Sequence, residues 1–165
     1  MKRGVAAWVG IVLALAGVAC VDTSGLADTP EYSLNEFTVY ALPVLLRDCG
    51  FQACHGSQER FFRVYGPGRA RLDPLEEAYA DLDGFEAEIS FSFTKAMIDP
   101  RNAKESLLLR KPLAVEAGGS GHEGVDKFGR NVYRTPDDDG FLVLQTWVLN
   151  YARTQQAAGT PPAAP

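Results

Sequence analysis

Apolar residues recur with helical spacing in several segments of the chain. Between residues 34 and 47 they return every three to four positions, which predicts an amphipathic helix. Ser33 and Glu36 have the spacing of a capping box at its start. Pro43 should bend this helix or mark its true beginning. The helix leads directly into Cys49.

Further helices are expected in the middle of the chain. Pro74 favours the start of a helix that continues through Tyr79, with Gly84 as an interruption. A second stretch, about residues 85–98, has one apolar face. That face consists of Phe85, Ile89, Phe93 and Ala96 or Met97. A short apolar turn or helix over residues 106–109 follows.

The last predicted helix has the clearest pattern. Asp137, Asp138 or Asp139 caps it, because a carboxylate suits the positive end of the helix dipole. Its apolar face consists of Phe141, Leu144, Val148 and Tyr151, with Trp147 beside it. Residues 117–130 are rich in glycine and predict a loop, and residues 154–165 predict a disordered tail. The pattern indicates an all-α domain over residues 33–153, in which the first and last helices pack against each other.

The N-terminus has the features of an export signal. Two basic residues precede an uncharged apolar stretch over residues 4–19, which is short for a bilayer-spanning helix. The stretch ends at Cys20, and Ala16 to Cys20 resembles the bacterial lipobox, although Gly17 replaces the usual leucine. The resemblance implies cleavage before Cys20, its acylation, and a membrane-anchored lipoprotein with a flexible tether over residues 20–32. The alternative is an ordinary signal peptide that is cut nearby.

Composition narrows the possible functions of the mature chain. Without residues 1–19 it carries 14 basic and 21 acidic residues, a net charge of −7. An acidic chain without a basic cluster is unsuited to nucleic acid. It also lacks a polybasic patch for anionic lipid, so the acyl anchor must hold it to the membrane alone. Val21 is not the aspartate of the enterobacterial retention signal, so we expect the outer membrane.

The cysteines point to candidate chemistry. Cys20 is assigned to lipid, which leaves Cys49 and Cys54 as a pair in an oxidising compartment. His55 follows at once, and two thiols with an adjacent histidine are what covalent haem attachment requires. Four residues separate the cysteines, whereas two are usual, and a local disulfide fits the spacing as well. A zinc site is a weaker third alternative, because too few ligands have standard spacing.

A wider resemblance favours haem. The segment from Ser106 to Pro112 (SLLLRKP), the glycine-rich segment with His122 and the helix around Trp147 resemble the planctomycete-type cytochrome c lipoproteins over residues 34–152. The resemblance implies a cytochrome c-like fold with one haem c and electron transfer to an unidentified redox protein. The alternative is a haem-free structural or interaction lipoprotein in which Cys49 and Cys54 form a disulfide.

The resemblance also implies roles for particular residues. Cys49 and Cys54 would hold the haem and His55 would be the proximal ligand. His122 is the expected distal ligand, and Met97 is the alternative that helical periodicity would place in the core. The aromatic residues expected to shield the porphyrin are Phe51, Phe61, Tyr65 and those of the last helix. No Gly-x-Ser-x-Gly elbow occurs, so we expect an electron carrier or binding module and not a catalyst.

Overall fold

The computed structural model describes residues 34–122 and 132–159, and in these ranges the chain is helical. Its elements are α1 (Leu34–Glu36), the π-helical turn η2 (Phe37–Ala41), α2 (Leu42–Asp48), α3 (Gly84–Lys95), the 3-10 turn η3 (Ala103–Glu105), α4 (Leu107–Arg110), the 3-10 turn η4 (Val115–Ala117) and α5 (Asp139–Gly159). The described ranges contain no strand beyond one isolated bridge, between Leu113 and Tyr133. The all-α prediction is confirmed. Cys20, the signal segment and the tether lie outside the described residues.

The first helical segment covers the predicted range, with a change of pitch in its middle. In η2 the amide of Leu42 donates to the carbonyl of Phe37, five positions earlier. Pro43 follows in the first turn of α2. Proline has no amide hydrogen for the carbonyl four residues before it, and a single wider turn absorbs this loss without ending the helix.

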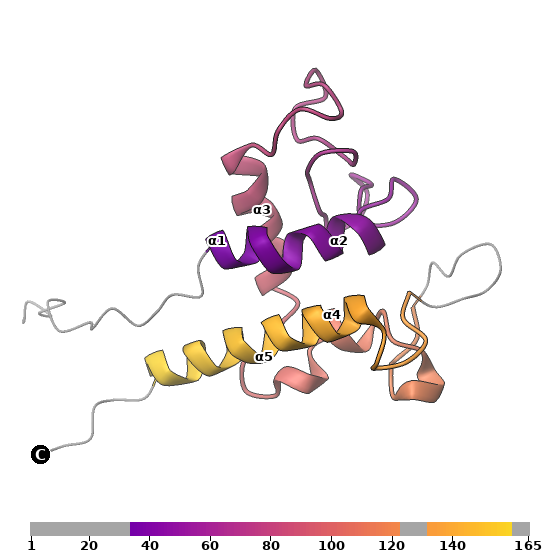
Figure 1. Cartoon of the computed structure of the whole chain (residues 1–165), viewed down its shortest axis with the longest axis vertical. Helices are drawn as coiled ribbons and strands as arrows, with labels where there is room; N and C mark the ends of the chain where they lie inside the picture. The colour runs from indigo at the N-terminus through magenta and orange to yellow at the C-terminus, as the bar shows by residue number, and fades with distance from the viewer. Residues whose placement is uncertain (1–33, 123–131, 160–165) are drawn as a thin grey trace, which may run out of the picture.

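Helix α5 lies antiparallel to the first helical segment (Figure 1). The aromatic contacts between them form the centre of the core. The Trp147 ring lies 5.6 Å from that of Phe37 and 6.3 Å from that of Phe91 of α3. Every residue of the predicted apolar face of α5 is buried. The predicted pairing of the first and last helices is therefore confirmed.

The end of α5 differs from the prediction. The helix continues to Gly159, so the expectation that the chain loses regular structure at Thr154 is wrong for residues 154–159. The residues there are mainly Gln and Ala, which favour helix, and the Gln156 side chain donates to the carbonyl of Pro100. None of the helices in the described ranges is long and apolar enough to span a bilayer.

Helix α3 has the expected extent but buries a different face. It starts at Gly84, after an N-cap by Asp83, and ends at Lys95. Phe85 of the predicted face is 58% exposed, whereas Phe91 is buried. The face that packs inward also carries polar side chains, namely Glu86, Ser90 and Thr94.

These buried polar groups are satisfied by partners elsewhere in the chain. Ser90 Oγ accepts from the Tyr65 amide at 2.9 Å, and Thr94 Oγ1 donates to the Ser90 carbonyl at 2.7 Å. Glu86 pairs with Arg71. Hydrogen bonding offsets the cost of burying a polar group. A pattern of apolar residues alone therefore selects the wrong face.

The helix predicted from Pro74 through Tyr79 is absent. Residues 72–83 form turns and extended backbone. Carbonyl groups that a helix would have bonded to its own amides accept instead from the Arg71 guanidinium, among them those of Glu77 and Ala80. The Arg71 side chain thus supplies hydrogen-bond donors that backbone amides would supply in a helix.

Candidate functional site

The segment between the two cysteines folds into a compact turn at the end of α2. The amide of Cys49 donates to the carbonyl of Leu45 at 2.9 Å and so closes the helix. The amide of His55 donates to the carbonyl of Cys49 at 3.0 Å, and the amide of Cys54 to that of Phe51 at 2.8 Å. These bonds fold back the four intervening residues, so the widened spacing still brings the cysteines and His55 to one place.

Gly56 is needed for the closure of this turn. A Cβ atom at position 56 would lie 2.5 Å from the carbonyl oxygen of Gly50, which no side chain tolerates. Arg69 supports the turn from outside. Its Nε donates to the carbonyl of Leu46 at 2.6 Å, and its guanidinium carbon lies 4.2 Å from the centroid of the Phe51 ring.

Both thiols are free and border one cavity, but their surroundings differ. Cys49 is buried among core residues, and burial, with smaller contributions from Asp48 and Cys54, raises its pKa to about 12. Cys54 is half-buried. Cys49 is therefore a neutral thiol at physiological pH.

His55 is held in a defined orientation on the same cavity. Its Nδ1 lies 3.0 Å from the carbonyl oxygen of Phe62, to which it donates, so Nε2 keeps its lone pair. Burial lowers the pKa of His55, and the nearby His122 and Arg60 lower it further against the opposing bond to Phe62. A neutral imidazole with one nitrogen fixed by a carbonyl is the form that binds a metal.

His122 is brought to the cavity by a backbone arrangement that the sequence did not reveal. The amide of Ser120 donates to the carbonyl of Arg110 at 2.9 Å, and a Cβ at Gly119 would lie 1.9 Å from the carbonyl oxygen of Leu113. Glycine at position 119 thus permits close contact with the segment after α4. The ring of His122 then lies 5.7 Å from that of His55, with an interplanar angle of 87°. The part of the glycine-rich segment over residues 123–131 lies outside the described residues.

The cavity has a volume of about 680 Å³, within the range of small-molecule and cofactor sites. It is bordered by both cysteines, both histidines and Met97, and its remaining wall is mainly apolar. Met97 is half-buried: it packs against the hydrophobic core, as periodicity predicts, and it also borders the cavity. No group of three or more His, Cys, Asp or Glu side chains within residues 34–122 and 132–159 has the geometry of a metal centre.

The aromatic residues expected to shield a porphyrin are mostly elsewhere. Of that set only Phe61 borders the cavity, and it is 73% exposed. Phe51 and Tyr65 do not border it, and Trp147 stacks on Tyr151 in the core, at 5.8 Å between centroids. The prediction is wrong for the aromatic residues of α5, since Trp147 packs against Phe37 of the first helical segment and Phe91 of α3. The apolar wall comes instead from Phe62 and aliphatic residues, among them Leu45, Leu108 and Leu144.

A polar cluster beside Cys49 is a feature that sequence reasoning missed. The Tyr133 hydroxyl donates to Asp48 Oδ2 at 2.8 Å, and Arg47 binds the same carboxylate with two nitrogens. Burial, with Cys49 and Asp48 nearby, raises the pKa of Tyr133, so its hydroxyl remains a donor. Tyr133 is placed by backbone bonds to Pro112 and Ala114, far away in sequence.

The residues present fit a covalently held haem. Cys49, Cys54 and His55 border a mainly apolar cavity, and His122 borders the same cavity. Two imidazoles that share one metal have ring centroids at most about 6 Å apart, because each metal–nitrogen bond is about 2 Å long. The observed 5.7 Å lies within that limit. Comparison with protein-family models, curated proteins and solved structures finds no match for this chain.

Proposed function

We propose that the mature chain is a monohaem c-type electron carrier, tethered to a membrane through a lipid on Cys20. One observation carries the proposal, namely that Cys49, Cys54, His55 and His122 border a single cavity. When bound, haem would supply a one-electron iron couple. The chain's own residues would attach it, ligate it and exclude water.

Attachment would use the two free thiols. Cys49 and Cys54 would each hold the haem through a thioether bond, and addition of S–H to a vinyl group, which forms one C–S and one C–H bond, would need no oxidant. The turn closed by the bond from the His55 amide to the Cys49 carbonyl supports this role, because it brings Cys49, Cys54 and His55 to one cavity. The carbonyl of Phe62 would fix the His55 ring, with Nε2 directed to the metal.

His122 would be the second residue to bind the iron. The distance of 5.7 Å between its ring and that of His55 favours it over Met97, which borders the same cavity. Two histidine ligands give a lower reduction potential than a histidine and a methionine. The proposed carrier would therefore work at the reducing end of the cytochrome c range.

The anchor fixes where such a carrier would act. Export and acylation at Cys20 would place the domain on the outside of the inner membrane or, as Val21 favours, on the outer membrane. The redox partner would be another protein of the cell envelope. Because the mature chain has a net charge of −7, anionic lipid headgroups would not attract it, and the lipid on Cys20 alone would hold it to the membrane.

The decisive experiment is expression of the full chain with a cytochrome c maturation system. After denaturing electrophoresis, haem stain should migrate with the polypeptide. Cys49→Ser and Cys54→Ser should each leave one vinyl group unreacted and shift the pyridine haemochrome band to longer wavelength. A colourless band, with a mass two hydrogens below that of the dithiol, would instead establish the haem-free protein with a disulfide.

The choice of axial ligand has its own matched pair of variants. His122→Ala should convert a low-spin spectrum to a high-spin one, whereas Met97→Leu should leave it unchanged. The reverse result would assign Met97 and refute the bis-histidine arrangement.

A further inference from the structure

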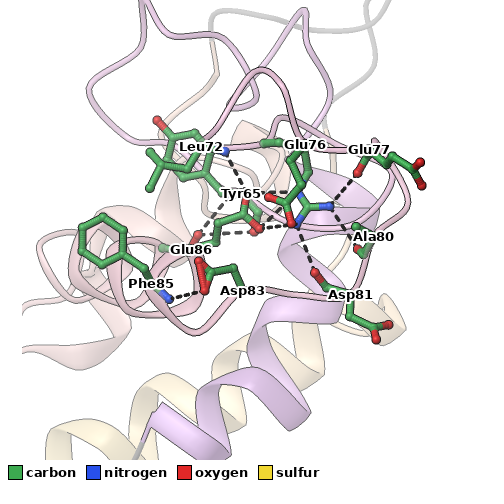
Figure 2. Close-up of polar contacts among 11 residues, drawn as sticks. Tyr65, Leu72, Glu76, Glu77, Ala80, Asp81, Asp83, Phe85 and Glu86 are labelled. Atoms are coloured by element: carbon green, nitrogen blue, oxygen red, sulfur yellow. Dashed lines mark hydrogen bonds and ion pairs between the residues drawn. The ribbon is translucent and has the colours of Figure 1, made fainter.

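Residues 72–83 form a projecting loop whose shape is fixed from within, here called the Arg71 loop. The side chain of Arg71, only 4% exposed, lies at its base. It donates to the carbonyls of Glu77, Ala80 and Asp81 at 2.9–3.1 Å. Figure 2 shows Glu77, Ala80 and Asp81 on one side of this cluster and Glu86, which also accepts from Arg71, on the other.

The loop is also tied to the rest of the domain. Glu86 of α3 accepts from Arg71 and, at 2.7 Å, from the amide of Leu72. The amide of Gly68 donates to the carbonyl of Ala78 at 2.7 Å. A loop held at both ends and at its centre is preorganised, so a partner that binds it pays little conformational entropy.

This rigid loop exposes large apolar side chains. Leu75 is 91% and Tyr79 is 85% exposed, the two highest values for large apolar side chains in the described residues. Neither contributes to the core, because Arg71 and not an apolar cluster organises the loop. Binding residues are often on loops that a rigid scaffold positions, and tyrosine is enriched among the residues that dominate binding energy.

The segment that carries these side chains is acidic, although Arg69 lies beside its base at Gly68. Residues 72–94 contain seven acidic residues and no lysine, arginine or histidine. Glu76 and Glu86 pair with Arg71, which leaves five carboxylates unmatched by that guanidinium. These are Asp73, Glu77, Asp81, Asp83 and Glu88. A surface of this charge is repelled by anionic lipid headgroups and by nucleic acid.

We propose that the Arg71 loop is a docking site for a protein whose surface is basic around an apolar recess. Leu75 and Tyr79 enter the recess, and the surrounding carboxylates face lysine and arginine side chains. Complementary charge directs the encounter, and the two apolar side chains provide most of the affinity. The proposal does not depend on haem, since no residue of the loop borders the cavity with the cysteines.

The test uses the full, lipidated chain in the cells that produce it. A photoreactive benzoylphenylalanine replaces exposed Ala78, which leaves Leu75 and Tyr79 intact, and the matched control replaces exposed Ala96 beyond the end of α3. We expect a discrete protein adduct from position 78 and none from position 96. Capture alone does not suffice, so the adduct is identified, purified and tested for binding to defined variants.

The binding measurements separate the apolar and the charged contributions. Leu75→Ser should weaken binding by at least about tenfold, the scale of an interface hot spot. A triple charge variant should weaken binding similarly and make the affinity less dependent on salt; it is Asp73→Asn/Glu77→Gln/Asp81→Asn. Glu59→Gln/Glu116→Gln/Asp137→Asn, with three exposed carboxylates elsewhere, should bind like the parent protein. Circular dichroism and thermal melting establish that each variant is folded.

Several results would overturn the proposal. They are no adduct from position 78, an adduct to lipid only, an adduct to a second copy of this chain, or an affinity that neither Leu75→Ser nor the charge variant changes. A chain that captures its partner but carries no haem would refute the electron-carrier proposal and leave this one standing.

Discussion

Replacement of Arg71 by Met tests whether one buried guanidinium holds the loop and α3 together. The side chains of Arg71 and Glu86 are 4% and 1% exposed, and Glu86 accepts from Arg71 through both carboxylate oxygens. Loss of one member of such a pair leaves an uncompensated buried charge, which costs about 3–5 kcal/mol. In a domain of this size that cost lowers Tm by roughly 10–20 °C.

The pH dependence identifies the cause of this loss. Burial alone would raise the pKa of Glu86, but the bonds from Arg71 and Leu72 outweigh it and lower the pKa. The pair therefore stabilises the parent protein above the unfolded pKa of Glu, and this contribution is lost as pH falls through the folded pKa. In Arg71→Met burial is no longer opposed by the guanidinium, so the pKa of Glu86 rises and acidification relieves the destabilisation. The difference in unfolding free energy between the two proteins should shrink as pH falls.

Urea denaturation between neutral and mildly acidic pH measures this difference. Arg71→Met/Glu86→Leu serves as the control, because replacement of both charges by apolar groups should recover most of the global stability. Amide exchange in residues 72–83 should be faster in both the single and the double variant than in the parent protein, since the loop carbonyls lack their donor in both. A loss below about 1 kcal/mol for Arg71→Met, or a double variant as unstable as the single one, would refute the reasoning.

Three further predictions concern the core and the cavity. Gly56→Ala should destabilise the chain by about 1–3 kcal/mol and reduce haem attachment, because its Cβ would lie 2.5 Å from the carbonyl oxygen of Gly50. Thermal melts and haem staining measure the two effects. Gly84→Ala is the matched control, because a Cβ at position 84 would have no atom within 4 Å. Trp147→Ala should cost about 3–5 kcal/mol in denaturant titrations, and a near-neutral result would contradict its central place in the core. In the haem-free chain, NMR titration should give His55 a pKa below 6.5. The free energy of unfolding should therefore fall as pH drops below 6.5, because the unfolded chain then binds a proton more readily than the folded one. His55→Gln should abolish this part of the pH dependence.

Periodicity predicted the elements whose packing is apolar. The face of α5 and its pairing with the first helical segment follow directly from the spacing of residues such as Phe141 and Leu144. The buried face of α3 was not predictable in this way. Glu86 and Ser90 are buried because Arg71 and Tyr65, many positions away, hydrogen-bond to them. Local patterns contain no information about such partners.

The candidate site, too, has residues that sequence patterns predict and contacts that they do not predict. The sequence identified Cys49, Cys54 and His55 through their adjacency, and it identified His122 as one of two alternatives. That His122 lies 5.7 Å from His55 depends on backbone bonds between segments distant in sequence. Asp48 and Tyr133 carried no recognisable motif, so only the fold could reveal their cluster beside Cys49.

The unequal burial of the two thiols has a consequence for the order of events in maturation. With a pKa of about 12, Cys49 contributes almost no thiolate at neutral pH, so exchange with an oxidant or a maturation enzyme in the folded chain must begin at Cys54. A mixed disulfide would then form on Cys54, and Cys49 would resolve it only slowly. Under the proposed function, attachment of haem to the buried Cys49 would therefore have to precede closure of the core.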